Sequence, residues 1–314
     1  MMKALVTGAS SGIGREIARL LAARGYDLIL CARREERLRQ LAAELPTACR
    51  VIAADIADER ECRLLYEAVR GEELEVVVNN AGFGLFGEFA STSLEEELRM
   101  IDTNIRAVHI LTKLAVRDFA ARGRGYVLNV ASSAGFLPGP LMATYYATKN
   151  YVLRLTEAIR EELRRAGSPV KVCALCPGPV DTEFNKVAGV RFSLGGLSAQ
   201  RVAREAVGGL FAGRGVVVPG AAMKAMTLAR HFAPDCSRAS PIISSTGKTA
   251  DDRAGDQKDA AARICAPAAP AVCGRGPGIR HGAVGRSDRG MHFRRQGLHA
   301  ARPAAAGCAA HGGL

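Results

Sequence analysis

The sequence predicts an α/β protein built on a doubly wound parallel sheet of about seven strands, with helices on both faces. Two observations carry this prediction. From Met1 to about Pro234, short apolar runs alternate with stretches of helical periodicity, and such an alternation requires crossover connections between parallel strands. The apolar runs are also nearly continuous in Val, Leu and Ile, as expected of strands that are covered on both faces.

The expected elements follow one another in a regular order along the chain. Strands are predicted at residues 3–7, 27–31, 50–54, 75–78, 125–131, 170–175 and 215–218. Helices are predicted at residues 13–24, 34–44, 58–70, 94–121, 144–165 and 199–210, with a further helical stretch at 223–232. A single domain of this length is ordinary for a doubly wound sheet.

Composition is that of an ordinary soluble protein, with 48% hydrophobic and 24% charged residues. We expect no membrane partner, because no uncharged apolar run reaches the roughly 18 residues that a spanning helix needs. The chain opens on a predicted strand instead of a secretory leader, so a cytoplasmic location is expected. Cys173 and Cys176 have CxxC spacing, but they fall along a strand. We interpret them as buried apolar side chains and predict no metal site.

The last part of the chain differs in texture from the rest. Residues 235–314 are rich in Ala, Gly, Pro and Arg and lack apolar periodicity, which predicts a catalytic domain at 1–234 and a disordered, low-complexity tail at 235–314. A change of reading frame near Asp235 is one hypothesis for this abrupt switch. The tail holds twelve Lys and Arg against six Asp and Glu, and so supplies half of the net charge of +12. Elsewhere basic and acidic residues interleave, and no nucleic-acid partner is predicted.

A glycine-rich turn follows the first predicted strand and opens the first predicted helix. It reads Thr7-Gly8-Ala9-Ser10-Ser11-Gly12-Ile13-Gly14. Glycines let the backbone turn tightly and approach a pyrophosphate, whose charge is stabilised by the N-terminus of the helix. The turn therefore predicts a dinucleotide site.

A tyrosine and a lysine lie one helical turn apart near the start of the long helix at 144–165. Tyr145 and Lys149 are an i, i+4 pair, so both side chains project from one face. A nearby ammonium favours the phenolate and lowers the pKa of a tyrosine from about 10 toward neutrality, which suits a proton donor to a developing alkoxide. Ser132 lies thirteen residues before Tyr145, at the end of the fifth predicted strand. Tyr146 and Ser133 are neighbouring alternatives.

These motifs together resemble the short-chain dehydrogenase/reductase family, a Rossmann-like family with TGxxxGxG, NNAG and YxxxK motifs, over roughly residues 3–220. The resemblance implies that Tyr145 is the acid/base, that Lys149 lowers its pKa and binds the nicotinamide ribose, and that Ser132 holds the substrate oxygen. Asn104 would anchor a proton-relay water. Tyr145 and Lys149 are also implied to contact the cofactor. Further cofactor contacts are implied at Gly8, Ser10, Ser11, Gly12, Ile13, Gly14, Asp55, Asn80, Ala81, Gly82, Pro177, Gly178, Val180 and Thr182.

The end of the second predicted strand bears on which cofactor is bound. NAD-binding relatives carry an acidic residue there, which holds the adenosine ribose. This chain has Cys31-Ala32-Arg33-Arg34 instead, and a guanidinium can bind the 2′-phosphate of NADP bidentately. By similarity Arg33 is the 2′-phosphate ligand, with Arg34 or Arg15 as candidate helpers. The predicted cofactor is NADP(H).

The predicted function is reversible NADPH-dependent hydride transfer to a carbonyl or secondary alcohol of a small apolar substrate. Residues 183–197 resemble the family's variable substrate lid. The apolar character is expected from Phe184, Val187, Val190, Phe192 and Leu194. The resemblance also implies a homodimer or homotetramer. A catalytically silent NADP-binding regulatory or scaffold protein is the alternative.

Overall fold

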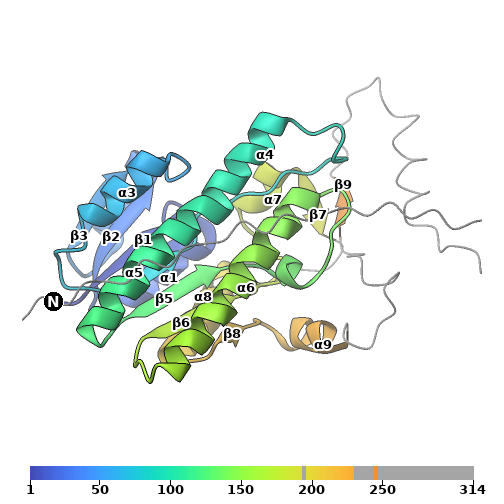
Figure 1. Ribbon diagram of the computed structural model, residues 1–314. Helices are drawn as coiled ribbons and strands as arrows, with labels where there is room; N and C mark the ends of the chain where they lie inside the picture. The colour runs from blue at the N-terminus through green and yellow to red at the C-terminus, as the bar shows by residue number, and fades with distance from the viewer. Residues whose placement is uncertain (193–195, 230–242, 246–314) are drawn as a thin grey trace, which may run out of the picture. The chain divides into compact units, whose positions relative to one another are not determined.

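The computed structural model describes residues 1–192, 196–229 and 243–245. Its centre is a seven-stranded sheet of order β3-β2-β1-β4-β5-β6-β8, and every neighbouring pair runs parallel (Figure 1). The strands are β1 (Lys3–Thr7), β2 (Asp27–Ala32), β3 (Cys49–Ala53), β4 (Leu74–Asn79), β5 (Tyr126–Val130), β6 (Lys171–Leu175) and β8 (Val216–Val217). All seven predicted strands are confirmed, each within about two residues of its expected bounds.

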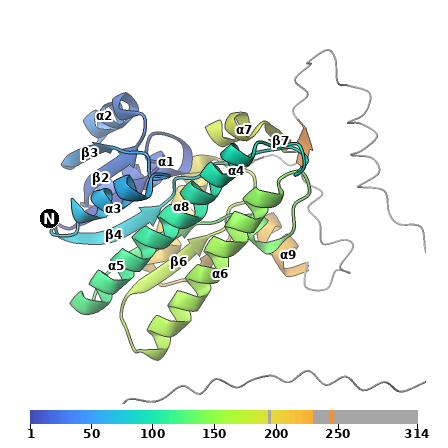
Figure 2. The ribbon, with the colours of Figure 1, turned by 45° about the horizontal axis from the view of Figure 1, so that its top comes forward.

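Helices cover both faces of this sheet, as predicted. One face carries α1 (Gly12–Ala22), α2 (Glu35–Glu44) and α8 (Ala199–Phe211). The other carries α3 (Glu59–Glu67), α5 (Val108–Arg122) and α6 (Ala143–Arg165), which lie in a row in Figures 1 and 2. Successive strand residues supply the two cores alternately: Leu5 packs beneath α3 and α5, and Val6 beneath α1 and α8. Burial on both faces explains the unbroken apolar runs.

The strand order reverses beside β1, and this reversal creates the ligand crevice. The chain moves outward from β1 to β2 and β3, then crosses back to β4 on the other side of β1 and continues to β5 and β6. The connections after β1 and β4 therefore diverge at the carboxyl edge of the sheet. Open α/β sheets bind ligands at such a switch point.

The expected helix at 94–121 is present, but it is not uniform. It consists of α4 (Leu94–Ile101), a π-helical stretch (Asp102–Ala107) and α5, without a break in the chain's helical course. Insertions of this kind occur often at functional sites. Here the π-helical stretch carries Asn104.

Several short elements were not predicted. They are a 3-10 helix (Ser133–Phe136), α7 (Glu183–Ala188) and an antiparallel pair of β7 (Val190–Phe192) with β9 (Ile243–Ser245). The predicted helix at 223–232 corresponds to α9 (Ala221–Ala229). Apart from β9, the predicted tail at 235–314 lies outside the described residues, and the prediction of disorder and the hypothesis of a frame change stay untested. No helix in the described part of the chain is long and apolar enough to cross a membrane.

Candidate active site

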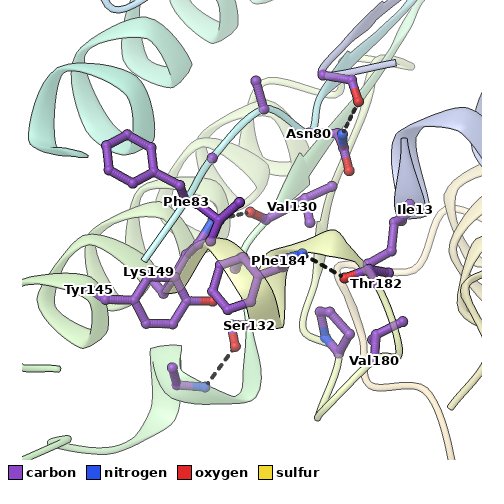
Figure 3. A pocket seen from close by; sticks show the side chains of 18 of the residues that line it. Ile13, Asn80, Phe83, Val130, Ser132, Tyr145, Lys149, Val180, Thr182 and Phe184 are labelled. Carbon is purple, nitrogen blue, oxygen red and sulfur yellow. Dashed lines mark hydrogen bonds between the residues drawn. The ribbon is translucent and has the colours of Figure 1, made fainter. Parts of the chain in front are cut away.

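The predicted site residues meet in one cleft of about 590 Å³ at the carboxyl edge of the sheet (Figure 3). Among the described residues, all the predicted cofactor and catalytic positions line this cleft except Gly14 and Asn104, which lie directly behind its wall. The residues come from the connections that follow β1, β2, β3, β4, β5 and β6 and from the start of α6. The sequence therefore predicted correctly which segments the fold brings together.

The glycine-rich turn requires glycine for two separate reasons. Gly8 and Gly12 have φ values of +66° and +56°, which L side chains rarely adopt. A side chain at Gly8 would also place its Cβ 2.8 Å from Cα of Ala81. At Gly14 the conformation is ordinary, but a Cβ would lie 2.3 Å from Nδ2 of Asn80. The bare backbone leaves room for a pyrophosphate at the start of α1, and the turn fits a dinucleotide.

The segment after β4 holds this turn in place. Asn80 Nδ2 donates to the carbonyl oxygens of Thr7, at 3.0 Å, and Gly8, at 3.2 Å. In return Thr7 Oγ1 accepts the backbone N–H groups of Asn80 and Ala81. These four bonds cross the switch point between β1 and β4. The resemblance implied cofactor contacts in this segment, and the structure adds that the segment fixes the glycine-rich turn.

Tyr145, Ser132 and Lys149 lie around one end of the cleft (Figure 3). Tyr145 is 8% and Lys149 is 5% exposed. The Ser132 side chain lies close enough to the Tyr145 phenol to affect its pKa, and it accepts the N–H of Ala134, which fixes its position. Lys149 Nζ lies 5.8 Å from the ring centroid of Tyr145 and donates to the Val130 carbonyl at 2.9 Å. The neighbouring alternatives Tyr146 and Ser133 also line the cleft.

Burial governs the protonation of both groups on α6. It raises the pKa of Tyr145 well above its usual value, and the nearby Ser132 hydroxyl opposes this rise. Burial lowers the pKa of Lys149 to about 8, so its ammonium form still predominates at neutral pH. The expected lowering of the Tyr145 pKa by Lys149 stays a prediction.

Asn104 is fully buried behind this group. Its Nδ2 donates to the Phe83 carbonyl at 2.9 Å and to Thr148 Oγ1 at 3.1 Å, and its Oδ1 accepts the Phe83 N–H at 3.1 Å. A Cβ on Gly82 would lie 2.9 Å from Asn104 Oδ1 and 3.3 Å from Lys149 Nζ. Asn104 therefore ties the segment after β4 to α6, next to the lysine that the resemblance singles out.

Where the cleft borders the end of β2 and the glycine-rich turn, the structure shows contacts that the sequence did not predict. Arg33 lines the cleft as expected, but Arg34 makes the hydrogen bonds: its Nη2 lies 3.3 Å from Ser10 Oγ and 3.2 Å from Ser11 Oγ. The same guanidinium pairs with Glu183 at 2.9 Å. No sequence signal pointed to Glu183, because this pairing joins residues 149 positions apart.

Asp55 lines the cleft after the end of β3, where the resemblance implied a cofactor contact. Its carboxylate is paired with Arg99 of α4 at 2.6 Å and also accepts the N–H of Ala57. Arg99 was not singled out from the sequence. The ion pair gives the Asp55 carboxylate a fixed orientation. The position of Asp55 in the cleft is consistent with the implied cofactor contact.

The opposite end of the cleft is apolar. The rings of Phe184 and Tyr145 lie 5.4 Å apart at 48°. Around them the lining side chains include Phe83, Phe136, Leu137, Met142, Tyr146, Val187 and Met223. Of the five lid residues expected to form the substrate pocket, Phe184 and Val187 line the cleft. Val190 and Phe192 belong to β7, and Leu194 lies outside the described residues.

The cysteines near the cleft are free thiols. Cys173 and Cys176 are both buried, and burial raises the pKa of each thiol, as expected of side chains that act as small apolar groups. Within the described ranges no cluster of three or more His, Cys, Asp or Glu residues could hold a metal ion.

The fold and this cleft define a dinucleotide-binding α/β protein of the doubly wound class. The family model described as short chain dehydrogenase matches residues 2–189. The chain thus belongs to the short-chain dehydrogenase/reductase family, a family of oxidoreductases. It is 35% identical over 185 residues to an uncharacterized oxidoreductase of Staphylococcus epidermidis, and the matched region covers 58% of this chain and 80% of that relative.

Solved structures of the same family resemble the chain closely. A short-chain dehydrogenase from Sphingobium yanoikuyae in complex with NADPH has 31% identity and a TM-score of 0.67, covering 74% of this chain and 94% of that one. A short-chain dehydrogenase/reductase from Burkholderia phymatum in complex with NAD has 25% identity and a TM-score of 0.68, covering 74% and 93%. These relatives bind either nicotinamide cofactor, so the choice between the two is a separate question.

Proposed function

We propose that this protein is an NADPH-dependent oxidoreductase that interconverts a carbonyl and a secondary alcohol, with Tyr145 as the proton donor and acceptor. The observation that carries the proposal is the meeting of Tyr145, Ser132 and Lys149 at the end of a cleft whose other end is a glycine-rich turn. When bound, the nicotinamide supplies or accepts the hydride, and the protein supplies orientation and the proton.

Each side chain has a defined task in this proposal. Ser132 holds the substrate oxygen beside the Tyr145 phenol, with which it shares one end of the cleft. Burial keeps Tyr145 protonated, so the proton is available for a developing alkoxide. The Lys149 ammonium favours the phenolate left after transfer, and it binds the nicotinamide ribose. Asn104 positions the segment that contacts Lys149 and anchors a relay water.

The preference for NADP(H) rests on charge at the adenosine end. Arg33 and Arg34 stand at the end of β2, where a carboxylate would repel a 2′-phosphate, and both line the cleft. The substrate class rests on the apolar side chains around Phe184 and Tyr145, which offer burial to hydrocarbon but few hydrogen bonds. We therefore propose a small apolar ketone, aldehyde or secondary alcohol as substrate, and a cytoplasmic homodimer or homotetramer as the working form.

Replacement of Tyr145 by Phe tests the catalytic assignment. We expect Tyr145→Phe to lower kcat by at least about 100-fold, the contribution typical of a positioned acid, while NADPH affinity changes little. Oxidation of NADPH, followed by its absorbance over a panel of ketones and aldehydes, measures the first quantity, and fluorescence titration measures the second.

Tyr146→Phe is the matched control, because this neighbouring phenol lines the same cleft and should leave kcat within a few-fold. Equal losses in the two variants would contradict the assignment. Wild-type protein that binds NADPH but reduces no member of the panel would favour a silent regulatory or scaffold protein instead. A clear preference for NADH over NADPH would overturn the cofactor assignment.

A further inference from the structure

Two arginines at the start of α2 share one carboxylate from the opposite side of the cleft. Arg34 Nη2 lies 2.9 Å from Glu183 Oε2, and Arg37 Nη1 lies 2.6 Å from Glu183 Oε1. Arg34 precedes α2 and Arg37 lies in its first turn, whereas Glu183 is the first residue of α7. The two oxygens of a single carboxylate thus each bind a guanidinium. We call these three residues the arginine clamp.

The arginine clamp lies at the adenosine end of the cleft. Arg34 also contacts the hydroxyls of Ser10 and Ser11 in the glycine-rich turn, and both Arg34 and Glu183 line the cleft. A guanidinium pair that binds a carboxylate through separate oxygens has the geometry that also suits a phosphate group. The chain therefore places an anion of its own on arginines that could bind the 2′-phosphate.

The ion pairs of the clamp form at neutral pH, but a stronger anion can replace Glu183 in them. Hydrogen bonds from Arg37 and Arg34 lower the pKa of Glu183 to about 2, so the carboxylate is ionised at neutral pH. The three side chains are 42–46% exposed, and ion pairs at such exposure contribute little net stability. A dianionic phosphate competes well for the same donors.

We propose that Glu183 is a specificity-determining residue that acts as an internal competitor of the cofactor's 2′-phosphate. This inference rests on the proposed function, since it assumes that NADP(H) binds in this cleft. The carboxylate neutralises Arg34 and Arg37 until a 2′-phosphate takes its place. NADH offers only a neutral hydroxyl at that position and cannot replace the carboxylate.

The alternative arrangement is a strap, in which the clamp closes over a bound cofactor and holds it. Electrostatics argues against it, because a carboxylate near the phosphates of the cofactor would be repelled. The two arrangements predict opposite effects of removing the charge: tighter NADPH binding for a competitor and weaker binding for a strap.

Replacement of Glu183 by Gln, which keeps the shape and removes the charge, separates them. Because the phosphate no longer has to displace two exposed ion pairs, we expect Glu183→Gln to lower the Kd for NADPH about five-fold. The Kd for adenosine 2′,5′-bisphosphate should fall by a similar factor, whereas those for NADH and AMP should change less than about two-fold. Titrations at one ionic strength measure all four constants.

Glu35→Gln is the matched control. Glu35 is the first residue of α2 and follows Arg34 in the chain, and its replacement removes the same charge, but it pairs with Arg39, outside the clamp. We expect all four constants to stay within about two-fold of wild type in this variant, because the lost carboxylate is exposed, pairs with Arg39 and is screened by solvent. A gain equal to that of Glu183→Gln would show a general charge effect and overturn the proposal.

Three other results would overturn the inference: unchanged NADPH affinity in Glu183→Gln, weaker affinity, or an equal gain for NADH. Each of these leaves the proposed function standing, because wild-type protein still binds NADPH. Wild-type protein that binds neither NADPH nor NADH would instead overturn the proposed function, and this inference with it.

Discussion

Lys149 is the residue whose protonation the proposed function connects most directly to activity. Burial lowers its pKa to about 8 and raises that of Tyr145, so Lys149 loses its proton first as the pH rises. If its ammonium is needed, kcat/KM for carbonyl reduction is maximal below about pH 8 and falls above it, since kcat/KM reports the free enzyme. A profile from pH 6 to 10 at constant ionic strength measures this limb.

Lys149→Arg is the control for this assignment. A guanidinium stays protonated throughout the range, so the variant should lose the limb near pH 8 even if its activity is low. A wild-type profile that stays flat to about pH 10 would contradict the role of Lys149.

Some residues of the site could be predicted from the sequence, and others could be found only from the folded structure. Tyr145, Lys149 and Ser132 could be predicted because their chemistry depends on short spacings, one helical turn and thirteen residues, that sequence displays directly. Glu183 and Arg99 could not. Their partners, Arg34 and Asp55, lie 149 and 44 positions away, and only the folded chain brings such pairs together.

At the scale of elements, the helix that carries Asn104 shows what an apolar sequence pattern cannot predict. The stretch 94–121 has a helical pattern throughout, and a helix is present throughout. The π-helical stretch Asp102–Ala107 inside it changes the direction of its side chains by a fraction of a turn, which an apolar pattern does not report. The position of Asn104 against Phe83 and Thr148 was therefore outside the reach of sequence reasoning.

The close approach of α1 to the segment after β4 can be tested at Gly14, with Gly208 of α8 as a helical glycine in open space. A Cβ at Gly14 would lie 2.3 Å from Asn80 Nδ2 and 2.6 Å from the Gly8 carbonyl, whereas a Cβ at Gly208 of α8 would meet nothing within 4 Å. We expect Gly14→Ala to lower the free energy of unfolding by about 1–3 kcal/mol through overpacking, and to weaken NADPH binding because the turn must shift. Urea unfolding and NADPH titration provide the two measurements.

Gly208→Ala is the matched substitution, a helical glycine replaced by the same residue. It should raise the free energy of unfolding by about 0.5–1 kcal/mol, since alanine restricts the unfolded chain and favours the helix. NADPH affinity should stay as in wild type. Equal stability changes in the two variants would mean that the contact between Gly14 and Asn80 does not constrain the turn.

For the whole molecule, the strands β1 to β6 and the layers that cover them could be predicted because each element is long enough to show its own pattern, and β8 could be predicted because it lies in a continuous run of valines after a long helix. The pair of β7 with β9 could not. Each strand has three residues, and they are paired across about fifty positions. Such short segments show no period of their own, and their pairing depends on the rest of the fold.

Cofactor binding should stabilise the whole described domain, because the cleft is formed by connections from six different strands and exists only in the folded chain. At about 100 times its Kd, NADPH should add about 2.7 kcal/mol to the free energy of unfolding, which raises the Tm of a domain of this size by about 5–10 °C. Differential scanning fluorimetry measures the shift, with NADH at the same concentration as the comparison. Tyr145→Phe should keep the shift, since its phenol oxygen acts on substrate. An equal shift with NADH would contradict the preference that Arg33 and Arg34 are proposed to supply.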